Sequence, residues 1–476
     1  MAVGFGMLYT LLRRYSWTGV SLNLLLCACV LQWAILCGGF WEIVRGRTNG
    51  SIPTSAFPAI QLTQEALIDG DYVVATILIS LGALLGRLSP TQAIWMAFFE
   101  TIIVTGNVSL SRYLGVADAG GSMIIHCIGA AFGLAFAAAL GDAAAAGTGN
   151  GEAVLGTSRA NGIFAMVGTL FLFLFWPSFN AALIEDPAAA SRAVINTILS
   201  ICGSVVVVFA LSRAVHGGRH LDMEHVQNAT LAGGVAIGAA CDMILNPGAA
   251  LATGVAAGIV SVYGFSFLSP FLKKKGLTDT CGIADLHLMP GIVGGIASAI
   301  AATGVTGDAW PSSAIASAFP GRGDRSPTTQ GGYQAAVMVI SLTIGAGGGY
   351  FSGFILRRVG WLVEPMADGF YEDATHWNVP KDDEELPELE AAVSRAMDVE
   401  RVASTAALWA ALEKALGRPL GPSPAMLALA PPASLSPSGV DAASANRRFT
   451  EGSVHGAVEM AARSEKSLHG REAKMQ

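Results

Sequence analysis

The amino-acid sequence predicts an all-α membrane protein of about 11 transmembrane helices. Of its 476 residues, 52% are hydrophobic and only 13% are charged, whereas soluble proteins carry about 25% charged residues. The mean hydropathy is +0.53. The apolar residues also come in blocks that approach or exceed the roughly 20 residues needed to cross a bilayer. A surface so poor in charge suits lipid, so we expect the lipid bilayer to surround most of the chain.

The apolar blocks define the expected helices in chain order. They are residues 2–12, 20–42, 72–88, 92–111, 121–141, 162–184, 193–212, 227–243, 248–270, 282–303 and 332–356. The first block is too short to cross a bilayer alone, and we expect the chain to start inside a helix whose beginning is missing. A cleavable signal peptide is not expected, because no small-residue cleavage site follows a basic start.

Lysine and arginine in the short connections indicate the orientation, because cytoplasmic loops carry the excess of positive charge. With the C-terminus inside, the inside connections hold Arg13, Arg14, Arg87, Arg159, Arg213, Arg219, Lys273, Lys274, Lys275, Arg357 and Arg358. The outside loops then hold Arg45, Arg47, Arg112, Arg192, Arg322 and Arg325. We therefore expect a multi-pass protein of the plasma membrane with a cytoplasmic C-terminus.

The chain divides into two expected parts. Residues 1–377 form the transmembrane domain, and residues 378–476 form a cytoplasmic C-terminal tail. The tail starts with an acidic run, continues through an Ala/Leu/Glu-rich stretch at 386–416 that suits one helix, and ends rich in Pro, Ser and Ala, which is typical of disorder. No basic patch indicates nucleic-acid binding.

Two histidines carry the most informative pattern. An ionisable group inside a membrane span is costly and is a functional candidate by default. His126 follows Asp118 by eight residues, and His287 follows Asp279 by eight residues, a helical rise of about 12 Å. The two units lie five spans apart, so their helices run in opposite directions. This arrangement is typical of an inverted five-plus-five repeat around a central pore, in which equivalent residues meet near mid-membrane.

Such a histidine pair would form a polar line for a small solute. Burial favours neutral imidazole, which donates a hydrogen bond from one nitrogen and accepts at the other. A neutral solute would be favoured over an ion, whose desolvation costs far more. Two readings stay open beside this one: separate structural histidines bonded to backbone carbonyls, and axial ligands of a haem.

Aromatic residues and one sequon mark the expected outer surface. Phe179 and Asn180 follow Pro177, where we expect the helix to be disturbed, and Tyr72 opens the third span. These rings are either interface anchors or a pore gate, and the residues alone favour anchors. Asn49 starts an Asn-Gly-Ser sequon in an outside loop and is a possible glycosylation site.

Four strings resemble the Rh glycoprotein branch of the ammonium transporter (Amt/Rh) family. They are Asp118-Ala-Gly-Gly-Ser-Met-Ile-Ile-His126, Phe175-Trp-Pro-Ser-Phe-Asn180, and the stretches 225–234 and 279–295. The resemblance runs from the first residues to about Trp377. It implies a homotrimer in which each subunit of eleven or twelve helices surrounds its own narrow hydrophobic pore.

The resemblance also implies roles for single residues. His126 and His287 match the family's twin histidines of the pore. Asp118 matches the carboxylate linked to recruitment and deprotonation of ammonium, and Asp279 is its counterpart in the second half. Phe179 and Tyr72 match the two rings of the pore gate, with tyrosine adding a hydroxyl. A further departure from bacterial Amt proteins is Leu183, which stands where they place a serine of the external cation site.

These observations together predict a channel-type transporter that conducts ammonia, with ammonium recruited and deprotonated at the outer vestibule. Carbon dioxide is a second candidate substrate for the same apolar pore. The alternatives are an ammonium sensor that signals through its C-terminal tail and a structural membrane component. An enzyme is not expected, because no nucleophile–base constellation stands out. No cofactor or metal is expected either, since the seven cysteines lack a metal-ligand spacing.

Overall fold

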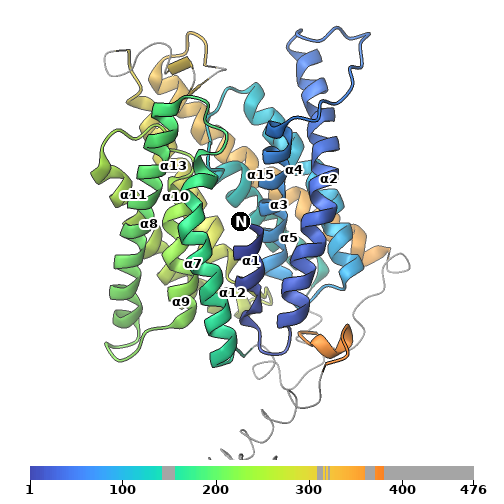
Figure 1. Cartoon of the computed structure of the whole chain (residues 1–476), viewed down its shortest axis with the longest axis vertical. Helices are drawn as coiled ribbons and strands as arrows, with labels where there is room; N and C mark the ends of the chain where they lie inside the picture. Colours follow the sequence, from blue (N-terminus) through green and yellow to red (C-terminus); the bar gives the residue numbers. More distant parts are fainter. Residues whose placement is uncertain (142–155, 308–314, 317, 320–321, 360–369, 380–476) are drawn as a thin grey trace, which may run out of the picture. The chain divides into compact units, whose positions relative to one another are not determined.

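The computed structural model describes residues 1–141, 156–307, 315–316, 318–319, 322–359 and 370–379. Every regular element in these ranges is helical, and the part up to Val379 is one compact unit. The expectation of an all-α membrane fold is therefore confirmed (Figure 1). The predicted helix at 386–416 and the disordered end lie outside the described residues.

The helices have the following bounds in chain order. They are α1 Ala2–Leu8, η1 Tyr9–Leu11, α2 Ser16–Thr48, α3 Gln64–Leu84, α4 Pro90–Tyr113, η2 Ser122–Cys127, α5 Ile128–Leu140, α7 Arg159–Ala181, α8 Pro187–Val215, α9 Met223–Asn228, η4 Ala229–Leu231, α10 Ala232–Ile237, α11 Pro247–Tyr263, η5 Gly264–Leu268, α12 Ser269–Lys274, η6 Ala284–Leu288, α13 Met289–Thr303, α15 Pro327–Arg358 and η7 Asp373–Thr375. Elements η2, η5 and η6 are π-helical turns. Such wider turns are rare and occur often at functional sites.

Nine helices of the described part are long and apolar enough to cross a membrane, and each overlaps one of the expected blocks. The two remaining blocks differ from expectation. The first contains only the short pair α1 and η1, which begins at mid-height of the bundle (Figure 1). The block 227–243 is not one helix, because it is divided among α9, η4 and α10.

Several helices begin with a cap followed directly by proline. The Ser89 hydroxyl accepts a hydrogen bond from the Gln92 backbone N–H, and the Gln92 side-chain oxygen accepts one from the Ser89 backbone N–H, which makes a capping box before Pro90. Proline suits the first helical position because it needs no N–H partner there. The same order starts three more helices, at Asp186–Pro187, Asn246–Pro247 and Ser326–Pro327.

Pro177 does not end its helix. Helix α7 continues through this proline and ends at Ala181. The apolar surroundings and neighbouring helices of a membrane bundle tolerate a proline that a soluble helix would not. Phe179 and Asn180 therefore lie on the last turn of α7.

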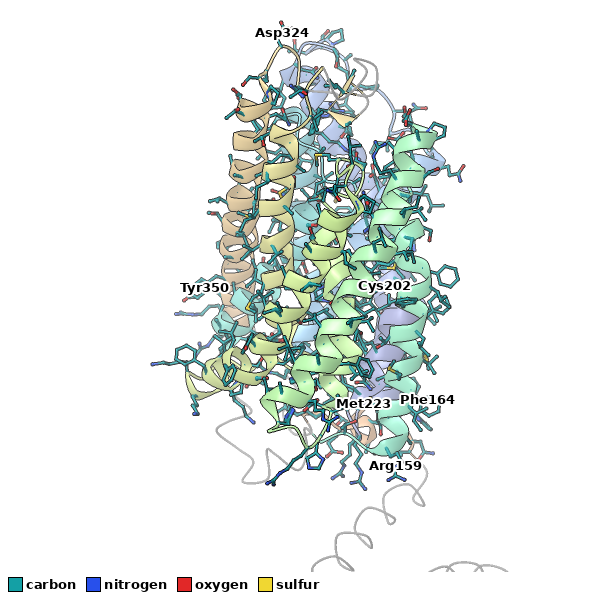
Figure 2. The ribbon with its side chains drawn as sticks, turned by 90° about the vertical axis from the view of Figure 1, so that its left-hand side faces the viewer. Arg159, Phe164, Cys202, Met223, Asp324 and Tyr350 are labelled. Atoms are coloured by element: carbon teal, nitrogen blue, oxygen red, sulfur yellow. The ribbon has the colours of Figure 1, made fainter. Side chains whose placement is uncertain are left out.

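The positively charged connections separate into two ends of the bundle. Arg14 pairs with Glu372 at 2.9 Å, and Arg87 donates to the carbonyl of Thr278 at 3.0 Å, so these connections meet at one end. Arg112 pairs with Asp69 at 2.7 Å at the opposite end. Figure 2 labels Arg159 at the first end and Asp324 at the second. Among the described residues, the two sets of connections therefore lie at opposite ends of the bundle.

A short segment after α15 returns to the beginning of the chain. The Asp373 carboxylate accepts hydrogen bonds from the backbone N–H groups of Trp17 at 2.9 Å and Thr18 at 2.7 Å. Trp377 donates its indole N–H to the Thr18 hydroxyl at 3.0 Å. The first turn of α2 is thus satisfied by residues more than 350 positions away in the sequence.

Candidate functional site

The two histidines predicted to meet do lie in contact at the centre of the bundle. The Nδ1 atoms of His126 and His287 are 3.1 Å apart, and the rings are nearly parallel, with an interplanar angle of 4°. Both side chains are buried. A hydrogen bond between two Nδ1 atoms requires a proton on only one of them. The pair therefore shares one proton along this contact, and each ring keeps its Nε2 atom for another partner.

Both histidines are displayed by π-helical turns rather than by regular α-helix. His126 lies in η2 and His287 lies in η6, and each turn continues into a membrane helix, α5 or α13. The residue that introduces each turn region is a glycine with positive φ, Gly121 at +71° and Gly282 at +65°. A left-handed backbone of this kind favours glycine. The same local backbone thus holds the histidine in both halves of the repeat.

Two more aromatic rings extend the histidine pair into a row. Trp176 stacks on His126 with ring centroids 5.8 Å apart, and Phe5 stacks on His287 at 6.1 Å. The His126 Nε2 atom is buried and has no hydrogen-bond partner among the described residues. A buried nitrogen without a partner is costly. It is therefore available to a small solute that can donate or accept a hydrogen bond.

The two aspartates bind the backbone at the start of these turns. One oxygen of Asp118, Oδ2, accepts from the N–H groups of Met123 at 2.9 Å and Ile124 at 2.8 Å. Asp279 uses both oxygens, because Ile283 donates to Oδ1 at 3.0 Å and Ala284 to Oδ2 at 2.8 Å. The aspartates therefore precede the helical turns and cap them instead of lying on them.

An asymmetry between the two carboxylates follows from these bonds. The second oxygen of Asp118 is buried and has no hydrogen-bond partner among the described residues, whereas both oxygens of Asp279 are used. Burial raises the pKa of Asp118, which lies before the membrane span, to about 7, while backbone N–H groups oppose the shift. Asp118 can therefore exchange a proton near neutral pH and still has an oxygen to accept it.

Tyr72 and Phe179 form a second pair of rings. Their centroids are 4.6 Å apart with an interplanar angle of 52°, and the Tyr72 hydroxyl donates to the Phe179 carbonyl at 2.6 Å. Both side chains are more than 90% buried. Interface anchors would be partly exposed at the membrane edge, so the anchor reading that the residues alone favoured does not fit this burial. Asn180 is held beside the pair by the Thr197 hydroxyl at 3.0 Å.

Further buried carboxyls lie within the expected spans and were not selected from the sequence, among them Glu100 and Asp285. Glu100 is completely buried in α4 and accepts a hydrogen bond from Ser80. Asp285 is completely buried in η6, two residues before His287, and accepts a hydrogen bond from Ser269. Both lie in apolar stretches of sequence, and that signal was available.

Asn49 and Leu183 lie apart from the histidine pair. Asn49 is exposed just after the end of α2, where its side chain accepts a hydrogen bond from the Ser51 N–H at 3.0 Å. Leu183 packs against the main hydrophobic core. In the part of the chain that the structure describes, no cluster of three or more His, Cys, Asp or Glu is arranged to hold a metal ion.

A bundle of membrane-spanning helices with a symmetric, buried polar pair at its centre defines a membrane protein of the transporter and channel class. The chain belongs to the Ammonium Transporter Family, whose family model matches residues 1–367. The resemblance inferred from the four sequence strings is therefore confirmed. Members of this family are transporters and channels and not enzymes, which also confirms that an enzyme was not to be expected.

Individual relatives support the Rh branch. The chain is 42% identical over 388 residues to Ammonium transporter Rh type C of Xenopus tropicalis, covering 80% of each chain. It is 39% identical over 389 residues to Ammonium transporter Rh type C-like 2 of Danio rerio, covering 81% of this chain and 77% of the relative. Among solved structures it is similar to Rh50 of Nitrosomonas europaea, with a TM-score of 0.64, 30% identity, and coverage of 83% of this chain and 94% of that one.

Proposed function

We propose that this protein conducts ammonia across a membrane along a path that passes the Tyr72–Phe179 pair and then the His126–His287 pair. The observation that carries the proposal is the Nδ1–Nδ1 contact of the two buried histidines in a chain of the ammonium transporter family. A neutral ammonia molecule both donates and accepts hydrogen bonds, which suits imidazole nitrogens that can do either.

Ammonium would give up its proton near Asp118. The buried second oxygen of this carboxylate lacks a partner among the described residues and can accept a proton. Ammonia and a protonated carboxyl are then both neutral, so neither pays the large cost of carrying a charge into an apolar surrounding. Asp279, with both oxygens on backbone N–H groups, has the structural role in this proposal.

The Tyr72–Phe179 pair would act as the gate of the path. The two buried rings are linked by a hydrogen bond, so passage requires the rings to move apart. An ion would have to lose its hydration shell to pass between them, and this requirement excludes ions more strongly than size alone. Carbon dioxide meets no such barrier and is a second substrate of this proposal.

The proposal includes the surroundings of the protein. The resemblance to Rh glycoproteins implies a homotrimer in the plasma membrane, with the Arg14 end and the C-terminus in the cytoplasm.

Asn49 is exposed at the other end and would carry a glycan. In animal cells, an Asn49→Gln variant with a lower mass than the wild type, by the mass of one glycan, would support this orientation. Asn228, which starts a second sequon but is buried, is the matched control and should not change the mass.

The ammonium sensor is the alternative function. It requires signalling through residues 378–476, of which all but the first two lie outside the described part. Deleting this tail separates the two functions, since a channel without its tail keeps ammonia permeability, whereas a sensor loses its output.

Stopped-flow recording of internal pH in proteoliposomes exposed to an ammonium gradient tests the proposal. The double variant His126→Ala with His287→Ala should alkalinise at the rate of empty liposomes, because the polar line is removed. His220→Ala changes an exposed histidine and should match the wild type. An unchanged rate in the double variant would refute the role of the histidine pair. Wild-type protein that matches empty liposomes would refute conduction itself.

A further inference from the structure

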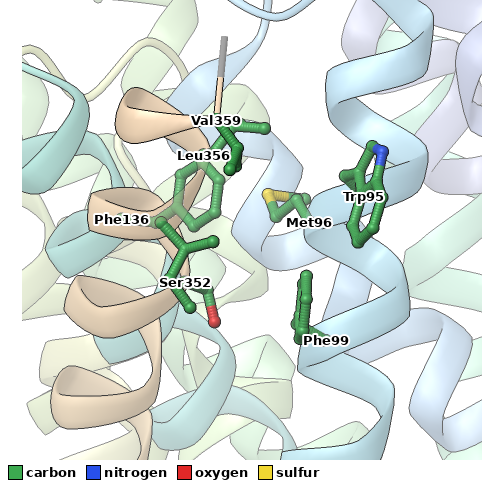
Figure 3. Close-up of a pocket in the computed structure, with 8 residues that line it drawn as sticks. Trp95, Met96, Phe99, Phe136, Ser352, Leu356 and Val359 are labelled. Carbon is green, nitrogen blue, oxygen red and sulfur yellow. The ribbon is translucent and has the colours of Figure 1, made fainter. Parts of the chain in front are cut away.

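A cavity of about 110 Å³ lies between α4, α5 and α15, away from the histidine pair (Figure 3). Its walls are almost entirely apolar. They include Trp95, Met96 and Phe99 of α4, Phe136 of α5, and Ser352 and Leu356 of α15. The cavity approaches the size of an engineered apolar cavity of about 150 Å³ that stays dry and binds benzene. An apolar molecule is therefore a better occupant than water.

The glycines of α15 explain why this space is not closed by packing. Gly345, Gly349 and Gly353 recur every four residues on the face toward α5. A Cβ atom at Gly345 would lie 2.6 Å from the Ile128 carbonyl oxygen, and one at Gly353 would lie 2.8 Å from that of Phe136. Small residues at this spacing allow the close approach of two helix backbones in a membrane. Helix α15 thus packs closely against α5 along this face.

One polar atom in the walls remains without a partner. The Ser352 side chain is only 3% exposed, and its hydroxyl makes no hydrogen bond to the described residues. Figure 3 shows this oxygen among the carbon atoms of the cavity walls. An unpaired buried hydroxyl has a free-energy cost, and a side chain of this size leaves space that a larger residue would fill.

Exposed apolar side chains flank the cavity on both helices. Phe98 on α4 is 41% exposed and Phe354 on α15 is 43% exposed, so apolar surface flanks the cavity on both helices. Val359, which also lines it, directly follows two exposed arginines at the end of α15. The Arg358 guanidinium lies 5.0 Å from the Phe354 ring centroid, and Arg357 donates to the Ala139 carbonyl at 3.5 Å. The two arginines and the cavity thus both lie at the last turns of α15.

We propose that this cavity binds part of one acyl chain of an anionic phospholipid whose phosphate pairs with Arg357 and Arg358. The apolar walls suit the chain, and the two guanidinium groups suit the phosphate. Trp95 beside the cavity is a residue type that favours the headgroup level of a bilayer. In this proposal the acyl chain fills the space between α4 and α15 at this end of the two helices.

Quenching of Trp95 fluorescence by brominated lipids tests the proposal. The full chain is reconstituted in phosphatidylcholine vesicles that contain phosphatidylglycerol or phosphatidylcholine brominated on the acyl chain. The difference between wild type and Trp95→Phe isolates the signal of Trp95 from that of the other tryptophans. Brominated phosphatidylglycerol should quench Trp95 at lower mole fraction than the zwitterionic lipid, by about 5-fold per arginine, since each basic residue near the surface contributes about 1 kcal/mol.

Three variants separate the parts of the site. Ser352→Phe fills the cavity and should weaken the quenching of Trp95, and Ser352→Val does the same with less strain. Arg357→Gln with Arg358→Gln should remove the preference for the anionic lipid and keep the quenching. Val339→Phe adds a ring at an exposed position of the same helix and should change neither quantity.

The opposite results would overturn the proposal. Equal quenching in wild type and both Ser352 variants would mean that no chain enters the cavity. No quenching of Trp95 by either lipid would mean that protein covers the site in the bilayer, whether from this chain or from a second copy. Quenching without a preference for phosphatidylglycerol would refute the pairing with the two arginines.

Discussion

Gly121 and Gly282 are separated by the same 161 residues as the two histidines that they precede, and both have positive φ. A Cβ atom at Gly121 would collide with the Ile125 side chain, and one at Gly282 would collide with the Phe265 ring. The repeat is thus preserved at the level of single backbone conformations. The matching backbone conformations hold the two histidines in equivalent positions, with their rings in contact and nearly parallel.

Gly282→Ala should destabilise the protein more than Gly276→Ala. Both glycines are left-handed, with φ of +65° and +79°, so each substitution costs about 1–2 kcal/mol of backbone strain. Only Gly282 faces a ring, whereas Gly276 has open space around it. Thermal unfolding in detergent should show the lower midpoint for Gly282→Ala. Equal midpoints would mean that Phe265 moves aside freely.

Substitution by asparagine should lower stability at Asp279 and ammonia flux at Asp118. Asp279→Asn loses one of two acceptor oxygens and leaves a backbone N–H unpaired, which costs about 1–3 kcal/mol. Asp118→Asn can keep both bonds on its single oxygen, so the fold should persist while ammonia flux falls because the proton acceptor is lost. Melting temperature and stopped-flow rates measure the two effects. A loss of stability alone at position 118 would contradict the proton-accepting role.

Tyr72→Phe tests the hydroxyl that this chain adds to the ring pair. The Phe179 carbonyl loses its donor at 2.6 Å, so stability should fall by about 1 kcal/mol while the ring contact remains. Ammonia flux should rise, because the two rings are no longer tied together. Tyr263→Phe alters an exposed tyrosine and serves as the control. A slower flux in Tyr72→Phe would argue that the hydroxyl guides the solute rather than holding the gate.

Asp373→Ala should loosen the first turn of α2. Two backbone N–H groups and the Thr18 hydroxyl lose their acceptor, with an expected cost of about 1–2 kcal/mol. Hydrogen exchange should accelerate at Trp17 and Thr18. Glu372→Gln removes the more exposed ion pair with Arg14, which should cost at most about 1 kcal/mol. Unchanged exchange in Asp373→Ala would show that water replaces the carboxylate.

The positions of the membrane helices could be predicted because they depend only on the length of apolar sequence. The break in the block 227–243 could not, because this block contacts residues that are distant in the sequence. A Cβ atom at Gly238, for example, would lie 2.8 Å from the Gly120 carbonyl carbon. Such close approach is invisible in a run of small apolar residues, which reads as an ordinary helix.

The sequence predicted which histidines meet, but it did not predict the backbone geometry that holds them. Equal spacing of Asp118–His126 and Asp279–His287 was enough to expect a meeting at mid-membrane. The π-helical turns were not expected, because nothing in residue type distinguishes them from a regular turn. Glu100 was missed for a different reason, since the rule that selected the histidines applies equally to a carboxyl in an apolar helix.

The bond between Asp373 and α2 has a consequence for the biogenesis of the protein. A ribosome makes Trp17 and Thr18 more than 350 residues before it makes their acceptor. Throughout that interval the N–H groups at the start of α2 depend on water or headgroups. The segment around Asp373 therefore supplies the acceptor for the first turn of α2. A nascent chain released before Asp373 would enter the membrane with the N–H groups of Trp17 and Thr18 lacking this acceptor.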